Sequence, residues 1–495
     1  MSFAKIYTRG LLGLHAPQIE VEVHISSGLP SLTIVGLAEA AVRESKDRVR
    51  SAIINSGFLF PTKRLTINLA PADLPKDGSR LDLPIALGIL IASGQLPENC
   101  TDGFEFIGEL ALDGHLRPVT GILPIAMACQ QAQHRLLVPT NNLEEANQLP
   151  QFEVYAANHL QDVCAHFLGT SHLSASPKHE NLTTTQYQFD LADVKGQLRP
   201  RRALEIAAAG GHSLLFKGPP GTGKTLLASR LPSILPPLNA QENLEVASIY
   251  SVANAQHTFG QRPFRAPHHT ASAIALVGGG SQPKPGEITL AHLGVLFLDE
   301  LPEFDRKVLE VLRQPLESKE IVISRAARQM TFPANFQFIA AMNPCPCGYA
   351  FNQDSRCQCS AENIQRYQNR ISGPLLDRID LHIDVPPLQT KELQDQSPTE
   401  SSTIVRQRVM KAYDKQMLRQ HCLNQALSPN LLEQYAQLDE NSAKIIEMAQ
   451  QRLNLSARAY HRVLRVARTI ADLAESEIIS SSHLTEALSY RGHST

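Results

Sequence analysis

The stretch Gly218–Thr225, which reads GPPGTGKT, constrains the fold of this 495-residue chain more than any other feature. It follows a short apolar run, 213–216, and precedes a segment that predicts a helix, 226–231. Between a strand and a helix, this pattern forms a loop whose backbone N–H groups turn inward around phosphates. The residues expected to contact the nucleotide are Gly218, Pro219, Pro220, Gly221, Thr222, Gly223, Lys224 and Thr225. The sequence therefore predicts an α/β domain with a parallel sheet between helices.

Other polar residues complete an ATP-hydrolysing site. Lys224 is expected to neutralise the β- and γ-phosphates, and Thr225 to offer its hydroxyl to Mg²⁺. Asp299 and Glu300 end an apolar strand, so Asp299 would hold Mg²⁺ while Glu300 orients and deprotonates the attacking water. Asn343 ends another strand and would position that water, the alternative being a turn residue before a proline. ATP and Mg²⁺ are the implied cofactors.

Composition divides the chain into three blocks and two linkers. The expected order is an α+β domain at 1–168, a linker at 169–188, an α/β core at 189–388, a linker at 389–402 and a helical lid at 403–495. Both linkers are polar and lack periodicity. The lid predicts helices near 403–420, 428–436, 440–452, 456–474 and 482–489.

Charge and hydropathy limit the classes of binding partner that the sequence suggests. The net charge is −2, so nucleic acid would need a local basic surface rather than a global attraction. The N-terminus makes a poor signal peptide, and the most apolar window, 81–92, carries Asp82 and Pro84 and is too short to span a bilayer. We expect a soluble, cytoplasmic protein with no membrane partner.

Four cysteines cluster in the core block, in a segment at 345–359. Cys345, Cys347, Cys357 and Cys359 form two C-x-C pairs separated by nine residues. Four thiolates this close together predict a structural Zn²⁺ site, although C-x-C pairs chelate one metal less readily than C-x-x-C pairs. Reduced structural thiols and redox chemistry are the alternatives.

Several long motifs resemble the magnesium-chelatase-like AAA+ ATPases, and in particular the ComM (YifB) group. They are FRAPHHTAS (264–272), GEITLAHLGVLFLDELPEF (286–304), AMNPCPCG (341–348) and RISGPLLDRID (370–380). The likeness covers nearly the whole chain. It implies a homo-hexameric ring that uses ATP to drive branch migration of DNA junctions during natural transformation. A chelatase-type ATPase that remodels a protein partner is the alternative from a different class.

The resemblance assigns roles to arginines. Arg378 matches the finger that reaches a neighbouring subunit's γ-phosphate, with Arg370 as the competing candidate. Arg458 matches the lid arginine that senses nucleotide. Because Arg462 and Arg465 lie on or near the same helical face, a solvated basic stripe is the alternative there.

The first block resembles the proteolytic domain of Lon, with its ribosomal S5 domain 2-like α+β fold. The likeness rests on PKDGS (75–79) and GELALDGHLRP (108–118). That family uses a serine nucleophile and a lysine base, but the matching positions here hold Arg80, with Ser79 one residue early, and Ile125. A serine without a base is a weak nucleophile, so we expect a catalytically inactive domain and disfavour an ATP-dependent protease.

Two segments are candidate DNA contacts. Residues 320–325 and 329–332 predict a hairpin at a place where related ring helicases have one, and it carries Arg325 and Arg328. A glycine-rich stretch upstream includes Lys284. Phosphate contacts from these side chains would suit single-stranded, duplex or branched DNA, because backbone charge is independent of sequence. An ordinary solvated hairpin is the alternative.

Overall fold

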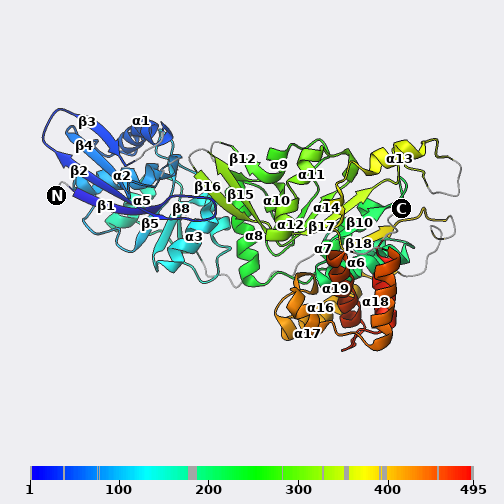
Figure 1. Ribbon diagram of the computed structural model, residues 1–495. Helices are drawn as coiled ribbons and strands as arrows, with labels where there is room; N and C mark the ends of the chain where they lie inside the picture. Colours follow the sequence, from blue (N-terminus) through cyan, green and yellow to red (C-terminus); the bar gives the residue numbers. More distant parts are fainter. Residues whose placement is uncertain are drawn as a thin grey trace. The chain divides into compact units, whose positions relative to one another are not determined.

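The protein was analysed as a computed structural model (Figure 1). The structure describes residues 3–36, 40–74, 76, 78–176, 187–280, 283–325, 328–350, 356–389, 392, 399–453 and 456–491. The chain divides into two compact units, Met1–Thr183 with Asn243–Phe259, and Thr184–Glu242 with Gly260–Thr495. Within these residues, no helix has both the length and the apolar character that a membrane crossing requires.

A mixed sheet of seven strands forms the frame of the first unit. Its order is β3-β4-β2-β1-β5-β8-β9. The bounds are β1 Phe3–Arg9, β2 Gln18–Ser26, β3 Ser31–Val35, β4 Arg64–Ala70, β5 Phe104–Phe106, β8 Arg135–Pro139 and β9 Val154–Ala157. Buried and partly exposed residues alternate along β2, so one face of that strand packs on the core. Strands β6 (Glu109–Leu110) and β7 (Leu116–Arg117) form a separate small ladder.

Helices enclose this sheet with apolar side chains. They are α1 Ala40–Asn55, α2 Asp82–Ala92, α3 Ile122–Gln131, α4 Leu143–Ala146 and α5 Leu160–Leu168, with short 3₁₀ turns η1 Ser79–Leu81 and η2 Thr140–Asn142. Every residue of α2 is buried, which explains why its sequence is apolar on all sides. The apolar window at 81–92, which the sequence shows to be too short for a bilayer, is therefore a core helix.

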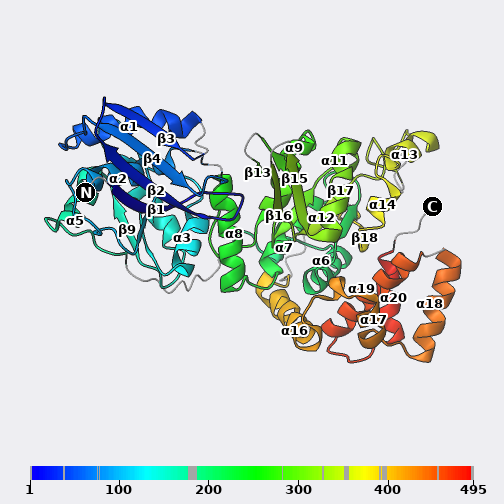
Figure 2. The same ribbon diagram turned by 60° about the vertical axis from the view of Figure 1, so that its left-hand side comes forward.

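Part of the block expected to form the ATPase core clusters with the first unit. Helix α8 (Ala240–Ala253) lies beside α3 (Figure 2). Its Leu244 and Ala247 belong to the apolar cluster that contains the buried residues of α3. The backbone amide of Gly121 donates to the Ser251 carbonyl oxygen at 3.2 Å. The compact unit thus includes a segment that is distant in sequence.

Five parallel strands form the sheet of the second unit, in the order β11-β14-β17-β10-β18. Their bounds are β10 Leu214–Lys217, β11 Phe264–Arg265, β14 Val295–Leu298, β17 Gln337–Met342 and β18 Leu381–Asp384. Fully buried β14 agrees with the prediction of a parallel sheet covered on both faces. Hairpins β12–β13 (Gly278–Gly279, Lys284–Pro285) and β15–β16 (Glu320–Arg325, Arg328–Pro333) leave this sheet.

The helices of the second unit cover the sheet and build the lid. Around the sheet are α6 Leu198–Gly210, α7 Lys224–Ile234, α9 Ala273–Val277, α10 Glu287–Leu290, α11 Arg306–Glu310, α12 Arg313–Ser318, α13 Ala361–Gln368 and α14 Gly373–Leu376, with 3₁₀ turns η3 Leu191–Asp193 and η4 Leu301–Glu303. The lid comprises α16 Ser402–Gln420, α17 Pro429–Tyr435, α18 Glu440–Leu453, α19 Ala457–Leu473 and α20 Ser481–Ser489, with 3₁₀ turn η5 Asn424–Ala426 (Figure 1). One apolar cluster joins lid and sheet.

The lid helices and the β15–β16 hairpin are confirmed close to their expected bounds. The side chains of Ser428 and Ser456 accept backbone N–H groups at the starts of α17 and α19, and the backbone N–H of Ser480 donates to Nδ1 of His483 at the start of α20. Residues 177–186, and 390–398 apart from 392, lie outside the described residues. The linkers expected across them stay predictions.

Candidate nucleotide site and its surroundings

The predicted phosphate-loop residues gather at one edge of the parallel sheet. The loop follows β10, the acid pair follows β14, and Asn343 follows β17, which lies between those two strands. Carboxyl ends of parallel strands meet at the same edge, where α/β proteins bind ligands. Gly218 approaches a backbone so closely that a Cβ there would lie 2.3 Å from the Val385 carbonyl oxygen. Only glycine fits at that position.

Lys224 begins α7 and turns back over the loop. Its ammonium donates to the carbonyl oxygens of Gly218 at 2.7 Å and Pro219 at 2.8 Å, and to Oδ1 of Asn343 at 3.1 Å. Burial lowers the pKa of Lys224, while Asp299 and Glu300 act in the opposite direction. The lysine and Asn343 are therefore brought together, and their polar atoms face the place that the loop encloses.

Thr225 and Asp299 are a second pair within the site. The Thr225 hydroxyl donates to Oδ2 of Asp299 at 2.6 Å. Hydroxyl and carboxylate oxygens are the hard ligands that Mg²⁺ prefers, so these two residues fit the metal expected beside the phosphates. The other oxygen, Oδ1 of Asp299, accepts the backbone N–H of Glu300 at 2.9 Å.

Glu300 has an unusual backbone. Its φ of 51° and ψ of 47° place a residue with a side chain in the left-handed region, a conformation that occurs mainly where the surroundings impose it. The strained turn lies between β14 and η4 and aims a half-exposed carboxylate out of the sheet edge. Such an arrangement suits a group that must meet a water molecule.

His269 contacts Glu300 but was not predicted as a site residue. Its Nδ1 lies 3.4 Å from Oε2 of Glu300, and its ring packs edge-on against Phe304. Because β11 pairs in parallel with β14, residues after β11 reach the same sheet edge as the acid pair. A histidine shortly after a short strand was the available signal, but β11 has only two residues and is hard to recognise in a sequence.

The two candidate finger arginines differ in exposure. Arg370 is 53% exposed, pairs with Glu303 at 2.9 Å, and lines a groove beside α13. Arg378 is 10% exposed and pairs with Oε1 of Glu317 at 2.6 Å. Arg458, at the start of α19, contacts the same oxygen of Glu317 at 3.3 Å. The structure thus brings Arg378 and Arg458 together, apart from Arg370.

A solvated basic stripe on α19 is a wrong interpretation for two of its arginines. Arg462 is buried with its Nε 3.7 Å from Asp380, and burial lowers its pKa to about 10. Arg465 donates from Nε to the Leu427 carbonyl oxygen at 2.9 Å. Arg462 thus connects α19 to the residue before β18, and Arg465 connects α19 to the residue after η5; the periodicity of α19 alone does not reveal these contacts.

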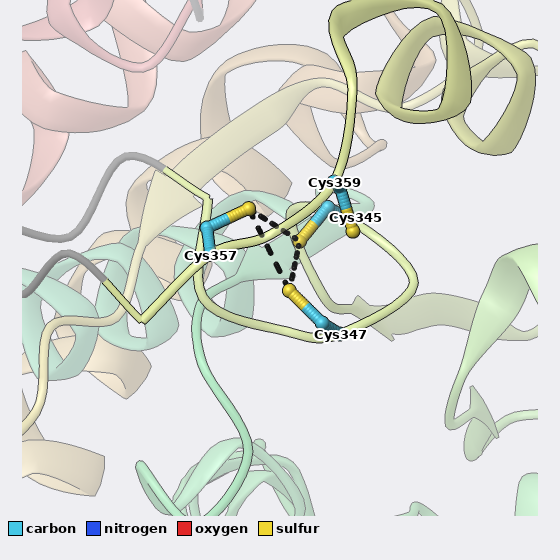
Figure 3. Close-up of side chains that lie close together, drawn as sticks. All are labelled: Cys345, Cys347, Cys357 and Cys359. Atoms are coloured by element: carbon cyan, nitrogen blue, oxygen red, sulfur yellow. Dashed lines mark hydrogen bonds between the residues drawn. The ribbon is translucent and has the colours of Figure 1, made fainter.

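The four clustered cysteines lie together in space (Figure 3). All four sulfur atoms of Cys345, Cys347, Cys357 and Cys359 are within 4.8 Å of one another. The sulfur–sulfur distances among Cys345, Cys347 and Cys357 run from 3.2 Å to 3.8 Å, close to the roughly 3.8 Å that a tetrahedral zinc–thiolate site requires. A hydrogen bond from the Tyr349 backbone, followed by one from Cys345, lowers the pKa of the Cys347 thiol to about 6. The donor set fits Zn²⁺.

The cysteine turn packs directly on the phosphate loop. Gly348 has a φ of +86°, and a Cβ at this position would lie 2.6 Å from Cδ of Pro220. The backbone N–H of Ala350 donates to Sγ of Cys345 at 3.2 Å. A metal held by these thiols would therefore fix a turn that supports the nucleotide loop.

The Lon-like motif residues of the first unit do not form a nucleophile and base. The Ser79 hydroxyl donates to the Glu109 carboxylate, and Ile125 is fully buried in α3. Arg80, at the position expected of the nucleophile, is buried. Lys76 is also buried, and its ammonium donates to the Pro71 carbonyl oxygen.

The candidate DNA residues occupy hairpin ends. Arg325 and Arg328 face each other at the last register position of β15–β16, next to residues 326–327, which lie outside the described part. Lys284 is exposed and begins β13. Nothing in these positions tests the contact with DNA, so it stays a prediction.

Together the parallel sheet, the phosphate loop, the acid pair and the helical lid define a nucleotide-binding protein of the AAA+ class, whose members use ATP and Mg²⁺. Family comparisons agree along most of the chain. Residues 190–393 match magnesium chelatase subunit ChlI, residues 21–142 match subunit ChlI of Mg-chelatase, and residues 399–491 match the C-terminal part of that subunit.

Individual relatives give a narrower assignment. The chain is 50% identical over 495 residues to YifB of Salmonella typhimurium, covering 99% of this chain and 97% of that protein. It is 49% identical over 499 residues to the competence protein ComM of Haemophilus influenzae, covering 99% and 98%. The chain belongs to the ComM (YifB) family of magnesium-chelatase-like AAA+ proteins. It is also 25% identical over 178 residues to Lon protease 2 of Bacillus subtilis, covering 33% of this chain.

Proposed function

We propose that this protein is a homo-hexameric, ATP-hydrolysing DNA motor that drives branch migration of recombination intermediates during natural transformation. The observation that carries the proposal is its near full-length similarity to a protein named for competence, and it is supported by the contacts of Lys224 with Asn343 and of Thr225 with Asp299. Uptake of foreign DNA produces branched intermediates, and moving a branch point requires repeated input of free energy. A ring of identical ATPases supplies that input.

The nucleotide site supports hydrolysis by the roles of its own side chains. Lys224 exchanges the carbonyl oxygens of Gly218 and Pro219 for phosphate oxygens when ATP binds. Thr225 and Asp299 would hold Mg²⁺, which would supply positive charge beside the phosphates. Glu300 accepts a proton from the attacking water, and Asn343 orients that water from the neighbouring strand.

An arginine from the adjacent subunit completes the site. A cation that arrives in trans stabilises the transition state only when the ring is assembled, which couples hydrolysis to assembly. We assign this role to Arg378, with Arg370 as the alternative, and nucleotide sensing to Arg458. Arg370 remains the alternative for the arginine finger because its side chain is the more exposed of the two.

The hairpins and the cysteine cluster complete the proposed machine. Arg325, Arg328 and Lys284 contact DNA phosphates, so binding does not depend on sequence and weakens with salt. Zn²⁺ on the four cysteines stiffens the turn that packs on Pro220. The first unit keeps a Lon-like fold without protease chemistry. The Ser79 hydroxyl donates to Glu109, and buried Ile125 occupies the position where Lon has its lysine base.

A second function is favoured by one observation. All three family matches name a magnesium chelatase subunit, a class in which an ATPase acts on a protein partner. On this alternative, ATP turnover would respond to a partner protein and not to DNA.

ATP hydrolysis by the full-length protein tests the proposal. We expect single-stranded, duplex or four-way-junction DNA to stimulate turnover, and expect Lys224→Ala and Glu300→Gln to abolish both basal and stimulated rates. Turnover that ignores all three DNAs, yet still depends on both residues, would keep the ATPase, reject the motor and favour the partner-remodelling function.

A further inference from the structure

One carboxylate contacts two arginines from different elements. Oε1 of Glu317, on α12, forms ion pairs with Nη2 of Arg378 at 2.6 Å and with Nη2 of Arg458 at 3.3 Å. Because the two nitrogens share one oxygen, the two guanidinium groups are immediate neighbours. Like charges this close repel each other, and the carboxylate between them offsets that repulsion.

The arginines differ in how firmly each is held without Glu317. Arg378 is 10% exposed, and its Nη1 donates to the Pro374 carbonyl oxygen at 2.6 Å. Its Nε is buried and has no hydrogen-bond partner within the described residues. Arg458 is 54% exposed in the first turn of α19, so Glu317 is the contact that orders its long side chain.

We propose that Glu317 is a positioning residue that holds Arg378 and Arg458 side by side as one cationic pair for the transferred phosphate. This inference rests on the proposed roles of the two arginines. A pair anchored on one oxygen cannot serve two distant phosphate groups, so both arginines act at the same nucleotide. The carboxylate sets their spacing before the nucleotide arrives, which removes the ordering cost from the chemical step.

Glu317 also connects this pair to the candidate DNA hairpin. Helix α12 ends at Ser318, and β15 begins at Glu320, so the carboxylate lies three residues before the hairpin. The intervening Lys319 adopts a left-handed backbone with a φ of 61° and is bonded through its carbonyl oxygen to the Ala334 amide after β16. The Glu317 carboxylate is thus joined to the hairpin by Ser318 and Lys319, and the residue after β16 is hydrogen-bonded to the second of these.

Steady-state ATP hydrolysis by the full-length protein tests the role of Glu317. We expect Glu317→Gln, which keeps the shape and removes the charge, to lower kcat about 10- to 100-fold with KM for ATP within about twofold. Glu317→Asp keeps the charge and should recover part of the rate. The matched control is Glu362→Gln, which removes an exposed ion pair with Arg366 on α13 and should leave kcat unchanged.

A double-mutant cycle separates positioning from a general structural effect. In an Arg378→Ala background, Glu317→Gln should lower kcat by less than about a further threefold, because the arginine pair that Glu317 spaces is already broken. Size-exclusion chromatography and thermal melting check that the variants assemble and fold. Wild-type kcat in Glu317→Gln, or multiplicative losses in the double variant, would overturn the inference. If Glu317→Gln fails to fold, the same comparison is made with Glu317→Asp.

The same ATP hydrolysis assays, made on four variants, separate a failure of this inference from a failure of the proposed function. Lys224→Ala and Glu300→Gln report on the nucleotide site, and Arg378→Ala reports on the arginine assignment. Loss of activity in Arg378→Ala with a normal rate in Glu317→Gln rejects only the positioning role. A normal rate in Arg378→Ala rejects the arginine assignment itself.

Discussion

The two units treat their polar motif residues in opposite ways. In the first unit, Ser79 is tied to Glu109 and Ile125 is packed in the core, so the motif residues serve the fold. In the second unit, Lys224 contacts Asn343, and Thr225 contacts Asp299, so each member of the motif set meets another member. The difference teaches that a motif is evidence of chemistry when its residues converge, and evidence of ancestry when they do not.

The largest expected effect separates the two units by a single substitution in each. Glu300→Gln should reduce ATP turnover at least about 1,000-fold, because the water loses its base while ATP still binds. Ser79→Ala should leave turnover unchanged and remove no proteolytic activity. Steady-state ATP hydrolysis and casein digestion measure both outcomes. Casein cleavage that disappears in Ser79→Ala would restore the protease hypothesis and break the comparison.

A smaller effect sharpens the assignment within the second unit. Arg378→Ala should lower turnover about 100- to 1,000-fold, because the transition state loses a cation. Mixing these subunits with Glu300→Gln subunits should restore part of the activity. In mixed rings, an intact base then faces an intact arginine.

Arg370→Ala is the control for that experiment, since its side chain is exposed and lies outside the Glu317 pair. If ATP turnover did not recover on mixing, Arg378 would act on the nucleotide of its own subunit. If mixing with Glu300→Gln subunits restored activity to Arg370→Ala but not to Arg378→Ala, Arg370 would be the arginine finger instead of Arg378.

Metal removal is expected to act through packing. Purified protein should contain about one zinc per chain, and Cys345→Ser should lose it and melt several degrees lower. Binding of ATP should weaken as well, because the cysteine turn rests on Pro220. Cys422→Ser, outside the cluster, is the matched control. Metal-free protein with unchanged melting would leave the cluster as reduced structural thiols.

The smallest expected effect belongs to the first unit and depends on pH. Burial raises the pKa of Asp82 to about 6, although its pair with Arg48 at 2.8 Å lowers it. The folded state thus binds the proton more tightly, and stability from this group is lost as pH rises from about 4 to 6. Relative to Asp82→Asn, the wild-type unfolding free energy should fall by about 3 kcal/mol at most across that range. Urea unfolding at several pH values measures it, and a constant difference would contradict the shift.

Much of the second unit could be predicted from the sequence because its signals are local. The phosphate loop, the acid pair and the lid helices each depend on neighbouring residues, and the structure has the strands and helices that carry them close to the expected positions. Contacts between distant elements left no such signal. Glu317 meets its arginines only after α12, α14 and α19 have packed, and His269 reaches Glu300 only through the pairing of two-residue β11.

The first unit shows the same limit. The apolar run at 81–92 is too short to span a bilayer, and the structure has it as the fully buried helix α2. The inclusion of Asn243–Phe259 in this unit could not be predicted, because composition changes nowhere near that stretch. Sequence reasoning succeeds where a residue's neighbours in the chain are also its neighbours in space.

The most direct test of the central claim is branch migration of a labelled four-way junction by the full-length protein. The account predicts that the junction is converted to duplex products in the presence of ATP and Mg²⁺. The Glu300→Gln variant should bind the junction without converting it. Wild-type protein that hydrolyses ATP normally yet leaves the junction intact under the same conditions would contradict the account.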